Sequence, residues 1–284
     1  MIPAAFDYVA PTTVDDAVRA LSEAGEDAKV IAGGQSLLPV LRMRLATPSK
    51  LIDLGRVPEL RGVREDGDHL VIGAMTTHYE VQRDPLIAEH ASLLALTTDS
   101  VADPQVRHRG TLGGSLAHAD PAGDLPAPVL ALDAEMVVRG MDGTRTIPAA
   151  EFFTDFFTTA LRPGEILVEV RVPKTTGWRA HYEKFNRVAQ AWSIVAVAAT
   201  VRVDGGSIAE ARVALTNMGA TPVRATSVEQ ALVGQSATAE TIRAAAEHAA
   251  EGTSPPTDGN ADAEYRQHLA RVLTSRAVSA AVGA

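Results

Sequence analysis

Hydrophobic positions in the first fifth of the chain alternate between a helical period and short apolar runs. A helical stripe between Thr13 and Gly25 predicts an amphipathic helix, with Thr13 as its cap and Gly25 as its end. A short apolar strand is expected over 29–32, a helix over 37–45 and a second buried strand over 50–54. These elements predict a small β-α-β-β unit.

The pattern restarts after Gly62 with strands and helices in mixed order. Asp142-Gly143 between two apolar runs predicts a hairpin, because Asp-Gly tolerates the positive φ of a tight turn. The elements expected in this region are strands over 69–74, 135–139, 145–148 and 166–172, a short helix beginning at Thr77, one longer helix over 85–98 and a helix over 126–132.

The last third of the chain has longer apolar strands and alanine-rich helices. Asp204-Gly205-Gly206 joins strands predicted over 193–203 and 208–216 into an antiparallel hairpin, and helices are expected over 227–232, 238–250 and 262–282. The polar segment PKTTGW, 173–178, is the best candidate for a domain boundary. We therefore expect an α+β protein with an N-terminal region 1–175, divided into about 1–58 and 59–175, and a C-terminal domain 176–284 with an antiparallel sheet.

Charge and composition exclude several classes of function. The net charge is −9 with no compact basic run, so we expect neither nucleic acid nor direct membrane insertion. The absence of cysteine excludes disulfides, a thiol nucleophile and an iron–sulfur cluster held by this chain. No leader pattern is seen at the N-terminus, so we expect a cytoplasmic protein that meets a membrane only through a partner.

Two double glycines are the most distinctive motifs: VIAGGQSLL at 30–38 and RGTLGGSLAHADPAGD at 109–124. A Gly-Gly after a strand can turn successive N–H groups in one direction and form a nest for phosphate oxygens, with Ser36 and Ser115 adding hydroxyls. The alternatives are two ordinary turns or two halves of a cradle for a dinucleotide pyrophosphate. Rossmann, P-loop and nucleophile-elbow motifs do not occur.

Other candidate residues have two interpretations each. Asp124 could bind ribityl or ribose hydroxyls, or cap the helix that follows. Lys184 could lie beside a flavin and favour its reduced anion, or pair with Glu183 or Glu169. His118 and Asp120 have ligand-like spacing, but two ligands do not make a metal site, and no metal is expected. Trp192 could shield a ring or anchor a domain interface.

Four segments together resemble the FAD-binding medium subunit of bacterial molybdenum hydroxylases, the aerobic carbon monoxide dehydrogenase and xanthine dehydrogenase group. They are the stretches that begin AGGQSLLPVL, RHRGTLGGSLAHADPAGD, EFFTDFFTTALRPGEILVEV and YEKFNRVAQAW. The resemblance covers nearly the whole chain. It implies a two-subdomain FAD-binding domain of the vanillyl-alcohol oxidase (PCMH) type, followed by an α+β domain of the carbon monoxide dehydrogenase flavoprotein type.

The resemblance also assigns site residues. The FAD-binding residues it implies are Ala32, Gly33, Gly34, Gln35, Ser36 and Leu37 in the first loop, Thr111, Gly113, Gly114 and Ser115 in the second, Asp120 and Asp124 after it, Ile166 and Leu167, and Lys184 beside the ring. Members that oxidise carbon monoxide commonly have histidine at the position of Gln35, so carbon monoxide is not inferred as the substrate.

The implied function is electron transfer within a heterotrimer, without a catalytic acid–base pair or nucleophile in this chain. The expected partners are a [2Fe–2S] small subunit and a molybdenum-cofactor large subunit, assembled as a dimer of heterotrimers. Two alternatives stay open. The chain could be a self-sufficient FAD-dependent oxidase or dehydrogenase with its own substrate pocket, or a nucleotide-binding module that never reduces its ligand.

Overall fold

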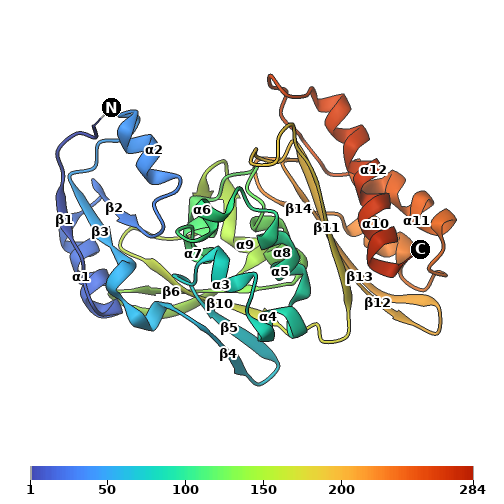
Figure 1. Cartoon of the computed structure of the whole chain (residues 1–284), viewed down its shortest axis with the longest axis horizontal. Coiled ribbons are helices and arrows are strands. Elements are labelled where there is room, and N and C mark those ends of the chain that lie inside the picture. Colours follow the sequence, from blue (N-terminus) through green and yellow to red (C-terminus); the bar gives the residue numbers. More distant parts are fainter. Residues whose placement is uncertain (1, 284) are drawn as a thin grey trace.

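The computed structural model describes residues 2–283, and three units follow one another along the chain (Figure 1). The N-terminal unit is a parallel sheet with strand order β1-β3-β2. Its elements are β1 (Asp7–Val9), α1 (Val14–Ala24), β2 (Ala28–Ile31), α2 (Leu37–Arg42) and β3 (Lys50–Asp53). The predicted β-α-β-β order is wrong. The order is β-α-β-α-β, because the short strand β1, which was not predicted, precedes α1, and the helix expected over 37–45 lies between β2 and β3 as α2.

The middle unit is an antiparallel five-stranded sheet with the order β4-β5-β10-β6-β7. Its strands are β4 (Val63–Asp66), β5 (His69–Gly73), β6 (Glu135–Gly140), β7 (Gly143–Pro148) and β10 (Ile166–Pro173). Its helices are α3 (His78–Val81), α4 (Pro85–His90), α5 (Ser92–Asp99), α6 (Pro104–Arg107), α7 (Leu112–His118), α8 (Pro126–Ala131) and α9 (Ala149–Phe152). The small hairpin of β8 (Phe153–Asp155) and β9 (Thr158–Thr159) completes the unit. The hairpin predicted around Asp142-Gly143 is confirmed.

The long helix predicted over 85–98 is two helices in the structure. Ala91 leaves the helical region, with φ −145° and ψ 48°, and separates α4 from α5. The carbonyl of His90 does not continue the helix, because it accepts hydrogen bonds from the backbone N–H of Thr175 at 2.7 Å and from the Thr175 hydroxyl at 3.1 Å. This partner lies in the connection to the C-terminal unit, far away in the sequence, so local periodicity could not reveal the break.

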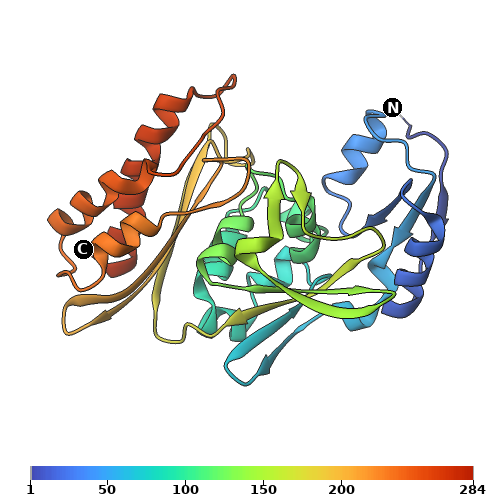
Figure 2. The same cartoon turned by 180° about the vertical axis from the view of Figure 1, so that it is seen from behind.

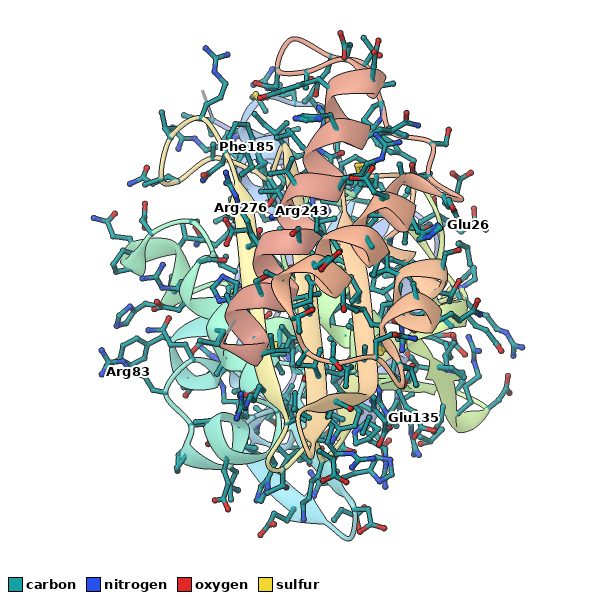
Figure 3. The ribbon with its side chains drawn as sticks, turned by 90° about the vertical axis from the view of Figure 1, so that its right-hand side faces the viewer. Glu26, Arg83, Glu135, Phe185, Arg243 and Arg276 are labelled. Carbon is teal, nitrogen blue, oxygen red and sulfur yellow. The ribbon has the colours of Figure 1, made fainter. Side chains whose placement is uncertain are left out.

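The C-terminal unit is an antiparallel sheet with the order β11-β12-β13-β14. The strands are β11 (Arg179–Phe185), β12 (Val195–Asp204), β13 (Ser207–Thr216) and β14 (Val223–Arg224), and the helices are α10 (Thr226–Leu232), α11 (Ala239–Ala246) and α12 (Ala263–Val282). Helices α10, α11 and α12 cover one face of this sheet, as Figure 3 shows from that side. Together with the middle sheet, this confirms the predicted α+β class with antiparallel sheets.

The opposite face of the C-terminal sheet packs against the middle unit, as the two opposed views show (Figures 1 and 2). In β12 every residue from Val195 to Val201 is buried. Val195 and Val197 belong to the core beneath α12, whereas Ala196 and Ala198 belong to the core that contains α5 and α8. Burial on both faces explains why this strand is apolar at consecutive positions rather than at alternate ones.

Candidate functional site

The first double glycine forms the turn between β2 and α2. Gly34 has φ +75°, a backbone conformation that favours glycine. Across residues 2–283, no group accepts a hydrogen bond from the backbone N–H of Gly33, Gly34, Gln35, Ser36 or Leu37. Gly34 is buried, and the last amides of this run belong to the start of α2, where a helix leaves its donors without a partner in the chain. This turn is therefore available to bind an anion through its backbone.

The second double glycine does not form an equivalent turn after a strand. Gly113 and Gly114 lie in the first turn of α7, which Thr111 caps through its side chain. The amide of Gly113 donates to the carbonyl of Ala74 at 2.8 Å, and the amide of Gly114 donates to the Thr111 hydroxyl at 3.1 Å. The expectation of two equal amide nests is wrong, because the structure already uses these donors. The Ser115 hydroxyl makes no hydrogen bond within the part of the chain that the structure describes.

The two glycine loops lie directly against each other. A Cβ placed on Gly33 would lie only 2.1 Å from the carbonyl oxygen of Arg109, and one on Gly114 would lie 3.2 Å from the Cβ of Ala32. Glycine at these positions therefore lets the backbones of the two loops meet. The structure brings together the two motifs that the sequence separates by about eighty residues, as the shared-cradle interpretation requires.

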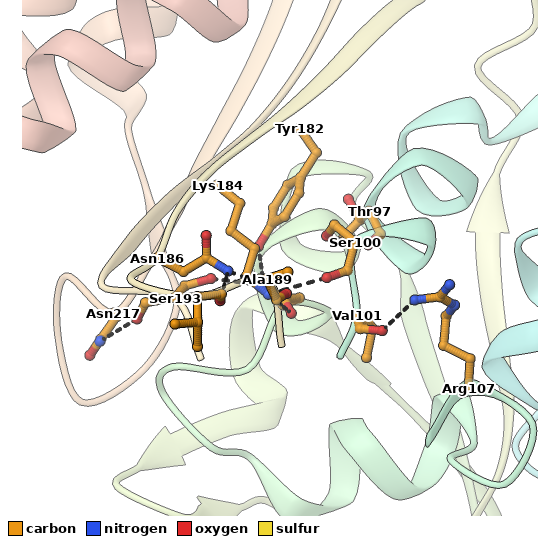
Figure 4. Close-up of polar contacts among 12 residues, drawn as sticks. Thr97, Ser100, Val101, Arg107, Tyr182, Lys184, Asn186, Ala189, Ser193 and Asn217 are labelled. Carbon is orange, nitrogen blue, oxygen red and sulfur yellow. Dashed lines mark hydrogen bonds and ion pairs between the residues drawn. The ribbon is translucent and has the colours of Figure 1, made fainter. Parts of the chain in front are cut away.

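Asp124 and Lys184 also come together, as a buried ion pair between the middle and C-terminal units. The distance from Lys184 Nζ to Asp124 Oδ2 is 2.8 Å, and the two side chains are 9% and 4% exposed. Tyr182 and Ser193 donate their hydroxyl hydrogens to Asp124 Oδ1, both at 2.8 Å. Figure 4 shows Tyr182, Lys184 and Ser193 converging from neighbouring segments of the C-terminal unit.

This arrangement decides against two of the open alternatives. Asp124 does not cap α8, whose cap residue Leu125 makes no side-chain cap bond. Lys184 pairs with neither Glu183 nor Glu169: Glu183 pairs with His181, and Glu169 pairs with Arg64. The buried carboxylate and the buried ammonium thus form an ion pair, and the Lys184 ammonium also donates to the carbonyl of Ser100 at 3.3 Å.

Tyr182 is a neutral donor in this cluster. Burial, reinforced by the negative charge of Asp124, raises the pKa of Tyr182 well above its ordinary value of 10.0. The tyrosine hydroxyl therefore keeps its proton and donates a hydrogen bond to the carboxylate. Sequence reasoning missed both Tyr182 and Ser193. For Tyr182 a signal existed, because residues two apart in a strand share a face and Lys184 was already a candidate.

The remaining predicted residues shape the surroundings of the site. Asp120 accepts a hydrogen bond from the backbone N–H of Ala122 at 2.9 Å, which makes the turn that leads towards Asp124. Ile166 and Leu167 are buried at the beginning of β10. Ile166 belongs to the core of the N-terminal unit, whereas Leu167 belongs to the core of the middle unit. These two residues thus lie where the two units that carry the glycine loops join.

Within residues 2–283, no group of three or more His, Asp or Glu side chains could hold a metal ion. His118 instead packs against Phe157, with ring centroids 5.0 Å apart. In the same residues, no helix is both long and apolar enough to cross a membrane.

The chemical groups of these residues match those that an FAD molecule needs. The first loop offers unpaired backbone donors and the Ser36 hydroxyl for a pyrophosphate, and glycine leaves no side chain in the way. The Lys184 ammonium is a nearly buried positive charge, and a group of that kind would favour an anionic reduced flavin placed beside it.

Two family models match the chain almost end to end. Residues 4–175 match the FAD binding domain in molybdopterin dehydrogenase, and residues 180–281 match the CO dehydrogenase flavoprotein C-terminal domain. The carbon monoxide dehydrogenase medium chain of Hydrogenophaga pseudoflava is 42% identical over 99% of this chain and 98% of its own length. The 6-hydroxypseudooxynicotine dehydrogenase complex subunit alpha of Paenarthrobacter nicotinovorans is 37% identical over 99% and 96%.

Solved structures show the same fold. A chain of the carbon monoxide dehydrogenase from Hydrogenophaga pseudoflava superposes with a TM-score of 0.97 at 43% identity, over 100% of this chain and 99% of its own. A chain of quinoline 2-oxidoreductase from Pseudomonas putida 86 superposes with a TM-score of 0.95 at 35% identity, again over 100% and 99%.

Proposed function

Since the chain belongs to the family of FAD-binding flavoprotein subunits of molybdopterin dehydrogenases, we propose that it is the FAD-binding electron-transfer subunit of a molybdenum hydroxylase. The five unpaired amide groups of the first glycine loop, in contact with the second loop, are the observation that carries this proposal. FAD, when bound, can take up and release one or two electrons and so connects one-electron and two-electron partners.

Each part of the site has a separate task in this proposal. The amides of Gly33 to Leu37 and the hydroxyls of Ser36 and Ser115 bind the pyrophosphate. Thr111, Gly113 and Gly114 hold the second loop in contact with the first. Asp124, with Asp120 shaping its turn, and Ile166 and Leu167 border the ribityl chain and ring. Lys184 places its positive charge beside the ring.

The rest of the reaction belongs to partner subunits. Without cysteine this chain cannot hold an iron–sulfur cluster, so we propose a [2Fe–2S] small subunit as the electron donor and a molybdenum-cofactor large subunit as the site of substrate oxidation. Chains similar to this one belong to enzymes named for carbon monoxide, 6-hydroxypseudooxynicotine and quinoline. The medium chain is therefore a poor guide to the substrate, and the large subunit is expected to select it.

The finer organisation is part of the same proposal. We assign FAD binding to 1–175, with subdomains of about 1–58 and 59–175, and assign 176–284 to the C-terminal domain that supplies Lys184. The complex is a cytoplasmic dimer of heterotrimers, and any membrane contact is made by a partner.

The experiment adds organic substrates to the FAD-loaded chain without oxygen and follows the visible absorption of the flavin, which bleaches on reduction. Organic substrates should leave the flavin oxidised in the isolated chain and bleach it only when both partner subunits are present. Bleaching of the isolated chain by an organic substrate would favour the self-sufficient oxidase or dehydrogenase. A chain that binds FAD but is never reduced, even in the complete assembly, would favour the non-redox module.

A further inference from the structure

Two hydroxyl groups of the C-terminal unit hold the carboxylate that pairs with Lys184. Tyr182 and Ser193 both donate to Asp124 Oδ1, while Lys184 donates to Asp124 Oδ2, all at 2.8 Å. We propose that Tyr182 and Ser193 are positioning residues for the flavin site, which act through Asp124 and set how much of the Lys184 charge is directed to the flavin ring. This inference rests on the proposed function.

Burial makes these hydrogen bonds strong. Tyr182 is 9% exposed, Asp124 5% and Ser193 2%. Water has little access to replace a missing donor, and a hydrogen bond to a charged group gains strength in surroundings of low polarity. The charge of Asp124 is therefore shared among three protein donors rather than with solvent.

Strand pairing and backbone hydrogen bonds hold the three donors in place around the carboxylate. Tyr182 and Lys184 are two residues apart in β11 and share one face of the strand. Ser193 precedes β12, where its carbonyl accepts a hydrogen bond from the Asn217 side chain at 2.9 Å. The next carbonyl, that of Ile194, accepts one from the fully buried Arg266 of α12.

The donors compete for one negative charge. When both hydroxyls are present, they donate hydrogen bonds to Asp124 Oδ1, and the Lys184 ammonium donates to Asp124 Oδ2 and to the carbonyl of Ser100. Loss of a hydroxyl leaves the carboxylate under-solvated and strengthens its attraction for the Lys184 ammonium. The Lys184 ammonium is then held more tightly by Asp124 and stabilises negative charge on the flavin ring less, so reduction of the flavin to its anion becomes less favourable.

The test is the two-electron midpoint potential of the flavin in the full-length, FAD-loaded chain, measured by titration against redox dyes. We expect Tyr182→Phe to lower the potential by about 30 mV, which corresponds to a tenfold weaker preference for reduced flavin. Ser193→Ala should shift the potential in the same direction and serves as the second variant if Tyr182→Phe does not fold. Tyr265→Phe is the matched control, because Tyr265 lies 45% exposed on α12.

A double variant separates action through Asp124 from simple loss of stability. In an Asp124→Asn background, Tyr182→Phe should change the potential little further, because the group through which it acts is gone. If Tyr182→Phe and Ser193→Ala lower only the unfolding temperature while Asp124→Asn shifts the potential, the inference is overturned and the proposed function stands. If Asp124→Asn leaves both FAD affinity and potential unchanged, the role of Asp124 in the proposed function fails as well.

Discussion

At the scale of single residues, the ion pair of Asp124 and Lys184 shows what the sequence can and cannot predict. Both residues were candidates from the sequence, each with a local alternative. The structure rejects the cap for Asp124 and the neighbouring glutamates for Lys184 and pairs the two residues with each other. Sixty residues separate them, so no local pattern could predict the contact. Ser193 had no signal at all, because a serine before a strand is ordinary.

The ion pair of Asp124 and Lys184 should contribute to the stability of the folded chain. Lys184→Met leaves the buried carboxylate without its counter-ion, and we expect the free energy of unfolding to fall by about 3–5 kcal/mol. Lys174→Met is the control: Lys174 pairs with the half-exposed Glu65, so its loss should cost less than about 1 kcal/mol. Urea unfolding of both variants measures the difference. Equal losses in the two variants would contradict the importance of the buried pair.

His78, which lies against Gly110 beside the second glycine loop, should make the stability of the chain depend on pH. Burial lowers the pKa of His78 to about 4, below its ordinary value of 6.5. The unfolded chain then binds the proton more readily than the folded chain, so stability is lost as pH falls from 6.5 towards 4. Between pH 7 and pH 5 this residue alone should remove about 2 kcal/mol from the free energy of unfolding.

The measurement is urea unfolding at both pH values for the wild type and for His78→Gln. The variant should lose about 2 kcal/mol less than the wild type over this interval. Identical losses would show that His78 takes up its proton equally easily in the folded and unfolded chains.

At the scale of elements, the two glycine motifs look alike in the sequence and differ in the fold. The first is a turn before α2 with unpaired amides, and the second is the first turn of α7 with its amides already bonded. Periodicity predicted most strands and the long C-terminal helix, because their apolar faces repeat locally. It could not predict that the amide of Gly113 is already bonded, because its acceptor, the carbonyl of Ala74, lies after β5, far away in the sequence.

Gly34→Ala tests the first loop. Alanine at φ +75° is strained by about 1–2 kcal/mol, and its Cβ would lie 3.0 Å from the Leu38 side chain, so the amide turn should relax and FAD affinity should fall at least tenfold. Gly252→Ala is the matched control, because Gly252 has φ +70° with open space around it, in the C-terminal unit between α11 and α12. It should show a similar loss of stability and unchanged FAD affinity by fluorescence titration. Equal FAD affinity in both variants would contradict the assignment of the amide turn.

At the scale of the whole molecule, the C-terminal sheet is buried between its own helices and the middle unit. The fold class followed from the strand and helix patterns, but this second covered face was not foreseen. It places Lys184, Tyr182 and Ser193 of the C-terminal unit against Asp124 of the middle unit. The C-terminal domain is therefore part of the proposed cofactor site and not an appendage to it.

The proposed heterotrimer predicts how the chain behaves when its partner subunits are present. When co-expressed with its proposed small and large partners, the chain should elute with them in one complex at a mass that fits two copies of each subunit. Light scattering coupled to gel filtration gives that mass. Elution of the chain alone, with both partners present and folded, would contradict the heterotrimer.

FAD binding through the joined glycine loops can be tested by equilibrium titration of the purified full-length chain with FAD. We predict saturation at one FAD per chain, with the two visible flavin bands in the bound state and weaker binding in Gly34→Ala than in Gly252→Ala. If the folded chain showed no saturable binding of FAD, the assignment of the glycine loops as the FAD site would be wrong.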